Sequence, residues 1–238
     1  MKSRIWASLA VTALMLTAGV QGALADPVSL RVSSGALSCT LTDGGAVASG
    51  GCIGGDANAT TGVVSWSTSI ADWSVTANTG FGSTVLGPGT LDLSFTGLHT
   101  GPTPSTLTIE FTQVSTSPSF PEFYLGIGGT LGSGQTVSYA AFIDNSNTAF
   151  GKPVGGQIGS TLVFASAGPY SGSTFGTGGG SAALYSLTQV ITITSNGLST
   201  AITSGDATVT TPEPTSLVLL GTGLIGLAGA FRRKFRAN

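Results

Sequence analysis

Few side chains in this sequence have the types and spacing that catalysis requires, and the histidine is the first to consider. His99 is the single histidine of the 238 residues, so a Ser-His-Asp arrangement would have to use it as the base. No Gly-x-Ser-x-Gly elbow between a strand and a helix accompanies it. The flanking segments Thr96–Leu98 and Thr100–Pro102 are typical of a turn. The sequence therefore predicts an exposed histidine without a catalytic role.

Carboxylate pairs and zinc ligands are the next candidates for chemistry. Glycoside hydrolysis needs two Asp or Glu side chains about the scissile bond, and Glu110 and Glu122 are the glutamates between residues 26 and 211. Glu110 occupies an outward position of an alternating strand, with Ile109 and Phe111 inward, which predicts a solvated side chain. One histidine and two cysteines are too few for a zinc site with three or four ligands. We predict that the protein is not an enzyme and needs no cofactor.

Two segments could supply oxygen ligands to calcium, which requires only hard oxygen donors on a loop. They are Asp56–Asn58 and Asp144–Asn147, each with side-chain oxygens at close spacing. Neither matches the twelve-residue EF-hand pattern, and both are ordinary Asx-turn sequences. Calcium binding is the alternative to a simple turn at both places.

Aromatic side chains could serve as platforms for the faces of sugar rings. The candidates are Trp66, Trp73, Tyr124, Tyr139, Tyr170 and Tyr185. In strands, Trp and Tyr are more often core or core-edge residues. A core position is therefore the default for each of them, and carbohydrate binding is the alternative.

Charge is scarce and unevenly distributed along the chain. Charged residues make up 8% of the sequence, and Gly supplies 37 positions, which suits a packed β protein with many turns rather than a disordered segment. Between residues 26 and 211 there are two basic residues, Arg31 and Lys152, against nine acidic ones. A phosphate backbone would find no basic patch there, so we expect no nucleic-acid partner. Cations or neutral polymers are a better match.

The first 25 residues have the three parts of a secretory signal peptide. Met1–Arg4 is a short positive region and Ile5–Val20 is an apolar run. Ala23 and Ala25 then place small residues where signal peptidase requires them. We predict cleavage before Asp26, with signal peptidase as a processing partner. The alternative is an uncleaved membrane anchor.

Export would place the two cysteines in an oxidising compartment, where one disulfide is the expectation. A bond between Cys39 and Cys52 would close a glycine-rich loop and stabilise the fold by about 3 kcal/mol on the chain-entropy model. A pair of free or metal-binding thiols is the alternative, but no further Cys or His lies nearby in the sequence.

Residues 26–211 alternate apolar and polar positions over short segments, as in Leu91–Phe95 and Leu107–Phe111. A period of two places one face of a strand on a core and the other in solvent. Turn residues separate the segments, for example at Gly168–Tyr170. About twelve such strands predict an all-β domain, an antiparallel β-sandwich of jelly-roll-like form. The Gly-rich segment Ser171–Ser181 is expected to be either a long mobile loop or a strand connection.

The last segment, residues 212–238, combines a hinge, an apolar run and a basic end. Pro212 and Pro214 flank Glu213 and interrupt any sheet ladder. The apolar run at 215–231 would be about 25 Å long as a helix, near the lower limit for spanning a bilayer, and we predict one transmembrane helix there. A basic stop that stays on the cytoplasmic side follows it: Arg232, Arg233, Lys234 and Arg236.

The order of these parts, Pro-Glu-Pro, a Gly- and Leu-rich run and an Arg cluster, resembles the PEP-CTERM sorting signal of bacterial exported proteins. The resemblance covers Pro212 to Arg236 alone. Such tails are also labelled an ice-binding protein C-terminal domain, a label that belongs to the tail and not to the body. The resemblance implies that a membrane-embedded exosortase recognises the tripeptide, cuts nearby and releases the body to the cell surface or the extracellular polysaccharide.

These observations favour three segments: a signal peptide at 1–25, a β-rich extracytoplasmic domain at 26–211 and a sorting and anchor segment at 212–238. The protein would be held in the inner membrane by its C-terminal helix and then reach the cell surface or the extracellular matrix. A non-enzymatic, structural or biofilm-associated role is the primary hypothesis. The alternative is a carbohydrate-binding module, with or without calcium, that acts on exopolysaccharide.

Overall fold

The body of the chain is built of strands, and the computed structural model describes residues 28–46, 48–87, 89–117, 120–178, 184–198, 200–211 and 222. Within these ranges lie twelve strands and one short helix, α2 (Ser83–Leu86). The strands are β1 (Val28–Ser34), β2 (Leu37–Thr42), β3 (Val63–Ile70), β4 (Trp73–Phe81), β5 (Leu91–His99), β6 (Ser105–Thr116), β7 (Glu122–Leu131), β8 (Gln135–Asp144), β9 (Gln157–Phe164), β10 (Gly168–Thr177), β11 (Tyr185–Ser195) and β12 (Ala201–Thr210). The prediction of an all-β body is confirmed.

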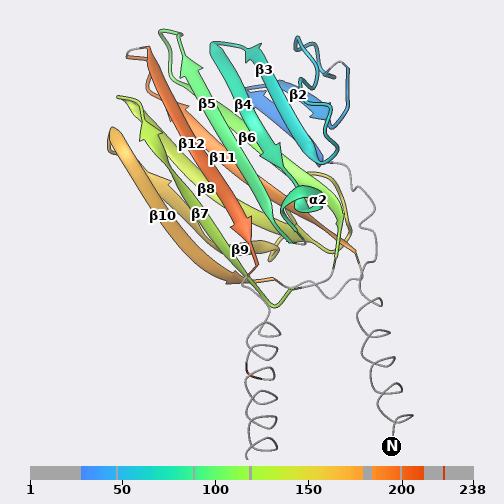
Figure 1. The fold of residues 1–238 in the computed structure, drawn as a ribbon. Coiled ribbons are helices and arrows are strands. Elements are labelled where there is room, and N and C mark those ends of the chain that lie inside the picture. The colour runs from blue at the N-terminus through green and yellow to red at the C-terminus, as the bar shows by residue number, and fades with distance from the viewer. Residues whose placement is uncertain are drawn as a thin grey trace, which may run out of the picture.

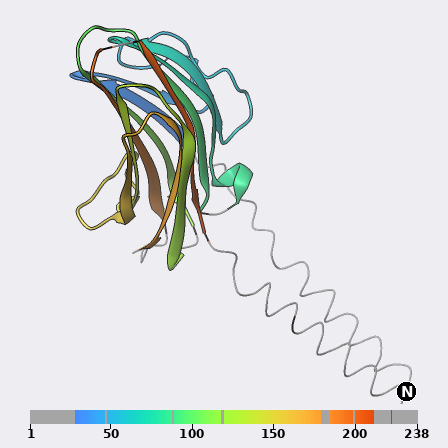
Figure 2. The same ribbon diagram turned by 90° about the vertical axis from the view of Figure 1, so that its left-hand side faces the viewer.

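The strands form two six-stranded antiparallel sheets. The first sheet has the order β2-β1-β6-β11-β8-β9, and the second sheet has the order β10-β7-β12-β5-β4-β3. Figures 1 and 2 show the two sheets stacked against each other, as in a β-sandwich. The jelly-roll form remains a prediction. The predicted signal peptide lies outside the described residues, as does all of the predicted C-terminal helix except Thr222.

The core lies between the sheets and follows from the period of two in the sequence. Along β5 the buried and half-buried residues alternate without interruption, so that Leu91, Leu93 and Phe95 are almost fully buried. From the first sheet, Ile109 and Phe111 of β6 are fully buried in the same cluster. Each such side chain contributes roughly 1.5–3 kcal/mol when it is removed from water. This burial holds the two sheets together.

Strand β10 differs from what the sequence predicts. Residues 168–170 were expected to turn and 171–181 to be a loop or connection, whereas Gly168–Thr177 is a continuous strand paired with β7 along its whole length. Gly and Ser have low strand propensity. Hydrogen bonding to β7 holds this segment in a strand although its own residues do not favour one. A contact between segments so far apart in the chain cannot be predicted from the local pattern of residues.

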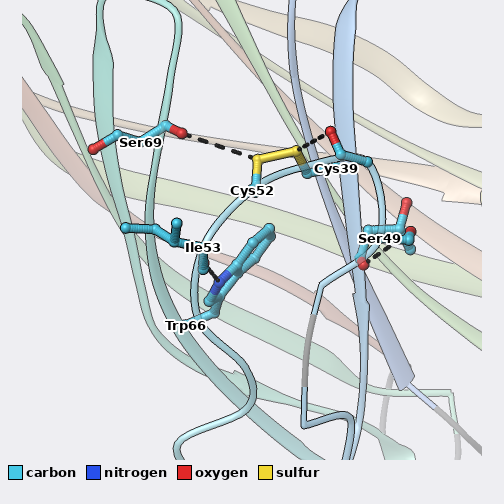
Figure 3. The surroundings of a disulfide bond; sticks show 8 residues. Cys39, Ser49, Cys52, Ile53, Trp66 and Ser69 are labelled. Carbon is cyan, nitrogen blue, oxygen red and sulfur yellow. Dashed lines mark hydrogen bonds between the residues drawn. A yellow bond between two sulfur atoms is a disulfide. The ribbon is translucent and has the colours of Figure 1, made fainter.

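A loop closed by a disulfide covers the edge where β2 and β3 lie. Cys39 of β2 is bonded to Cys52 with 5.9 Å between their Cα atoms, which confirms the predicted disulfide. On the other side, the Cys52 Sγ lies 4.0 Å from the Ser69 carbonyl oxygen of β3. The Trp66 indole N–H donates to the carbonyl of Ile53 in the loop at 3.0 Å (Figure 3). The loop therefore links the edge strands of both sheets and shields them from pairing with another chain.

Both ends of the body lie beside the turn that contains α2. A β-carbon placed on Gly82 would lie 2.5 Å from Val28 Cγ1, and one placed on Gly89 would lie 2.6 Å from Thr211 Cγ2. Val28 and Thr211, the first and last residues of the body that the structure describes, thus lie at the same end of the sandwich. In the part of the chain that the structure describes, no helix has the length and apolarity to cross a membrane. Of the predicted transmembrane helix at 215–231, the described part includes Thr222 alone.

Candidate functional site

A depression with a volume of about 540 Å³ lies on the outer face of the second sheet, and we call it the glycine groove. It crosses strands β7, β10 and β12. Its lining residues are Tyr124, Gly126, Ile127, Gly128, Ser171, Gly172, Ser173, Asp206 and Thr208.

Strand register places the small residues of the groove side by side. Gly126 of β7 lies opposite Ser173 of β10 and Thr208 of β12. Gly128, one step along the same face, lies opposite Ser171 and Asp206. Side chains alternate between the faces of a strand, so these positions point away from the core. Two glycines in the middle strand leave the floor of the groove without side chains.

An aromatic pair stands at one end of the groove. The rings of Tyr124 and Phe175 are cross-strand neighbours with their centroids 5.0 Å apart and tilted by 60°. Tyr124 leans over Gly126, because a β-carbon on that glycine would lie 3.2 Å from Tyr124 Cε1. Phe175 is 65% exposed, which is unusual for a phenylalanine. The pair presents apolar ring surface next to the polar groove.

Two carboxylates lie on the same face. Asp206 lines the groove, and Asp92 of the neighbouring strand β5 lies diagonally across from it. Burial, the negative charge of Asp206 and a hydrogen bond with Asp206 raise the pKa of Asp92 to about 6. The two basic residues of the body, Arg31 and Lys152, both bind Glu110 on the first sheet. The groove therefore has negative charge without a compensating cation from the described part of the body.

Hydroxyl groups, a carboxylate and ring surface lie together in this depression and can bind a ligand. Hydroxyls of Ser171, Ser173 and Thr208 can donate and accept hydrogen bonds, and the Asp206 carboxylate is a strong acceptor. The ring face of Tyr124 can cover an apolar surface of a ligand. The arrangement can hold an uncharged ligand that is rich in hydroxyl groups.

Of the predicted aromatic platforms, Tyr124 alone lies at the groove. The other five are buried: Trp66, Trp73, Tyr139, Tyr170 and Tyr185. Their polar atoms bond inside the fold, since the Trp73 indole donates to Ser105 Oγ at 2.9 Å and the Tyr139 hydroxyl donates to the Thr208 carbonyl at 2.9 Å. Burial also raises the pKa of Tyr139 well above its ordinary value. The predicted core position is confirmed for these five residues.

The prediction of an exposed His99 is wrong. His99 is the last residue of β5 and is fully buried, with its ring 4.7 Å from the Trp73 ring. Neither ring nitrogen has a hydrogen-bond partner among the residues that the structure describes. The alternation of buried and half-buried residues in β5 continues through Gly97, so that His99 faces the core. The turn-like residues that follow His99 led to the wrong prediction. A buried, unpartnered ring is not placed to act as a base.

The prediction of a solvated Glu110 is also wrong. Its side chain points to the outer face of the first sheet as expected, but it is only 3% exposed. The Arg31 Nε lies 2.5 Å from Glu110 Oε2, and the Lys152 ammonium bonds the other oxygen. Burial alone would raise the pKa of Glu110, but the hydrogen bonds from the two cations lower it below its ordinary value. Glu122, by contrast, is exposed at the start of β7.

The two candidate calcium segments form the Asx turns that the sequence allows. Asp56 accepts the backbone N–H groups of Asn58 and Ser65, each at 3.0 Å, and Asp144 accepts that of Ser146 at 2.8 Å. Within the described ranges, no group of three or more His, Cys, Asp or Glu residues is placed to hold a metal ion. The carboxylates here organise their own loops.

The processing residues predicted from the sequence lie outside the described residues. They are Ala23 and Ala25 of the signal peptide, Pro212, Glu213 and Pro214 of the sorting motif, and Arg232, Arg233, Lys234 and Arg236 of the basic stop.

The comparison with known protein families gives a match at the C-terminal end of the chain. Residues 210–234 match the family model of the PEP-CTERM protein-sorting motif. The chain therefore carries this sorting motif, as the resemblance implied, and the match begins at the last residue of β12. Among curated proteins, no sequence matches the chain.

Two solved structures match parts of the chain. TmCBM61, solved in complex with beta-1,4-galactotriose, covers 60% of this chain and 90% of its own length, with 6% identity and a TM-score of 0.36. The enzymatically active domain of bacteriophage CBA120 tailspike protein 4 covers 64% of this chain, which spans 20% of that structure, with 11% identity and a TM-score of 0.34. At TM-scores this low, neither match bears on what this chain binds.

Sequence reasoning missed most of the groove. Gly126, Gly128, Phe175 and Asp206 did not stand out as site residues, since none belongs to a chemical motif. One signal was present: every second residue of the strand from Tyr124 is a glycine or a threonine, so its outer face is almost bare.

Proposed function

We propose that this protein is exported and delivered to the bacterial surface or extracellular matrix by its PEP-CTERM tail, with an exosortase as the releasing partner. The observation that carries the proposal is the match of residues 210–234 to the sorting motif. The match begins where β12 ends at Thr210, so the sorting signal follows the folded body directly.

The three predicted segments form the route of this proposal. A signal peptide at 1–25 directs export and is cut by signal peptidase, the body at 26–211 folds outside the inner membrane, and 212–238 anchors it through a helix at 215–231. Both ends of the body lie beside the α2 turn, and this placement supports the route because leader and anchor would emerge toward the same membrane. The disulfide between Cys39 and Cys52 also suits an oxidising compartment.

In its final location the body acts as a non-enzymatic component of the surface or matrix, of sandwich or jelly-roll-like form. The covered β2–β3 edge supports this role, since a protein kept at high local concentration must avoid edge-to-edge aggregation. A second candidate function, carbohydrate binding on exopolysaccharide, is favoured by the glycine groove.

Changing Pro212-Glu213-Pro214 to three alanines in the producing cell tests the sorting proposal. Cell fractionation and mass spectrometry should show a form that keeps its tail and remains in the inner membrane. The matched control changes Pro102 and Pro104 to Ala, because this pair has the same Pro-x-Pro spacing in an exposed loop of the body. Export and mature mass unchanged by the tripeptide variant would overturn the proposal.

A further inference from the structure

We propose that the glycine groove is a binding site for a neutral polysaccharide chain. This site and ligand class extend the second candidate function, carbohydrate binding. The proposal rests on the proposed export in one respect, because export would bring the protein to the extracellular polysaccharide. The occupant follows from three properties of the groove: its bare floor, the chemistry of its walls and its charge.

The fold does not require glycine at position 128 of the groove floor, whereas a β-carbon on Gly126 would be crowded, 3.2 Å from Thr208 Oγ1. Gly128 has no left-handed backbone angle, and a β-carbon there would meet the Tyr170 carbonyl oxygen at 3.5 Å and Ser171 Cβ at 3.7 Å, which are ordinary contacts. Gly129, the next residue, is different, because its β-carbon would lie 2.0 Å from the Ser204 carbonyl oxygen. Glycine inside a strand weakens it and often marks a bulge, a tight bend, or the close approach of a ligand or another backbone. The pairing of β7 with β10 and with β12 has no register shift at Gly128. The space over Gly128 is therefore free for a ligand.

The walls offer the two kinds of contact that a sugar ring can use. The rings of Tyr124 and Phe175 give exposed apolar surface for the C–H face of a sugar. Across the bare floor, Asp206, Ser171 and Ser173 are exposed and can bond sugar hydroxyls. The depression of about 540 Å³ is open to solvent, so a ligand would lie along it rather than be enclosed.

Strand pairing argues against a peptide as the occupant. Extended peptides commonly bind by adding a strand to a free sheet edge. The edge strand here is β10, but the groove lies over the face of the sheet and is centred on β7, which is paired with β10 on one side and β12 on the other. Its backbone groups are used by the sheet. The ligand must therefore be held by side chains and ring faces, as a polysaccharide is.

The negative charge at the groove favours a neutral polysaccharide over an anionic one. Asp206 is the charged residue of the lining, and Asp92 adds negative charge beside it. Arg31 and Lys152, the two cations of the body, are held by Glu110 on the opposite sheet. An acidic polysaccharide would meet repulsion in the groove without a cation to offset it.

The experiment is isothermal titration calorimetry of the full chain, purified in a detergent without a sugar headgroup, against galactomannan, xyloglucan, dextran and alginate. We expect binding to at least one neutral polymer and weaker or no binding to alginate. Tyr124→Ala and Asp206→Asn should each weaken that binding about tenfold. Gly128→Val, which fills the floor, should abolish it, and Tyr124→Phe, which keeps the ring, should retain most of it.

Thr192→Val, at an outward position of β11 on the first sheet, is the matched control and should bind as the unchanged chain does. Circular dichroism melting of every variant separates lost binding from lost folding. Binding to no neutral polymer, a preference for alginate, or binding unaffected by Gly128→Val and Tyr124→Ala would each overturn the proposal. None of these outcomes affects the sorting proposal, which fails only if the tripeptide variant is processed normally.

Discussion

The outer faces of the two sheets are opposite in construction. On the first sheet, residues 145–156 fold back over the strands: the Ser186 hydroxyl donates to the Thr148 carbonyl at 2.7 Å, and the Phe150 N–H donates to Thr112 Oγ1 at 3.2 Å. The Arg31 guanidinium lies 4.2 Å from the centre of the Phe150 ring. This segment covers the part of the face where Glu110, Thr112 and Ser186 are buried and bonded. Further along the same face Thr106, Thr136 and Thr194 are exposed.

On the second sheet the corresponding face is open. Its middle strand carries Gly126 and Gly128 where the first sheet carries paired polar residues, and its carboxylates, Asp92 and Asp206, lack a cation from the described part of the body. From this difference we infer that the bonded polar groups beneath residues 145–156 stabilise the fold. A bare, uncompensated face is the one available to a ligand.

The largest expected effect comes from breaking the paired face. Glu110→Ala would leave Arg31 and Lys152 without their shared partner, and we expect the free energy of unfolding to fall by about 2–3 kcal/mol, since both cations are partly exposed. Urea denaturation measures the change. Glu122→Ala, at an exposed position, is the control and should cost less than about 0.5 kcal/mol. Equal effects of the two variants would contradict the assigned role of Glu110.

An intermediate effect is expected in the core between the faces. Gln189 is fully buried, and its amide has no hydrogen-bond partner among the described residues. Gln189→Leu should therefore raise the free energy of unfolding by about 1–2 kcal/mol. Gln135→Leu is the matched control and should lower it, because Gln135 accepts from the Thr203 hydroxyl at 2.5 Å and donates to the Ala201 carbonyl at 3.2 Å. The same sign for both variants would show that pairing does not distinguish them.

The smallest expected effect is a pH dependence of opposite sign on the two faces. The pKa of Asp92 is raised from 3.8 to about 6 in the folded protein, so between these values the folded state binds more protons than the unfolded chain and its stability falls as the pH rises. Partial exposure limits this loss to about 1 kcal/mol. The pKa of Glu110 is lowered from 4.5, so its contribution is complete above that pH and is lost as the pH falls below it.

Denaturation midpoints of the unchanged chain and of Asp92→Asn between pH 4 and 7 measure the Asp92 contribution. The variant should lose the decline in stability from pH 4 to 6 and be the more stable of the two at pH 7. An identical pH profile for both proteins would contradict a contribution of Asp92 to the pH dependence of stability.

Structural features that depend on residues close together in the chain could be predicted from the sequence, whereas features that depend on contacts between distant segments could not. The strand at Leu91–Phe95 follows from alternation and the Cys39–Cys52 bond from the presence of just two cysteines in an exported body, and both are confirmed, although β5 runs on to His99 where a turn was predicted. The burial of Glu110 depends on Lys152, 42 residues away in the chain, and no local pattern encodes that contact. The groove depends on the register of three strands. Its glycines become a site only when Ser171 and Asp206 are brought beside them.

The measurement that tests the contrast between the faces most directly is hydroxyl-radical footprinting of the full chain with and without the neutral polysaccharide that it binds. We expect oxidation of Tyr124 and Phe175 to slow when the polymer is added, while oxidation of Phe142 and Phe150, on the outer side of the first sheet, does not change. Protection of Phe150 with Tyr124 and Phe175 left unprotected would contradict the assignment of the open face as the binding face.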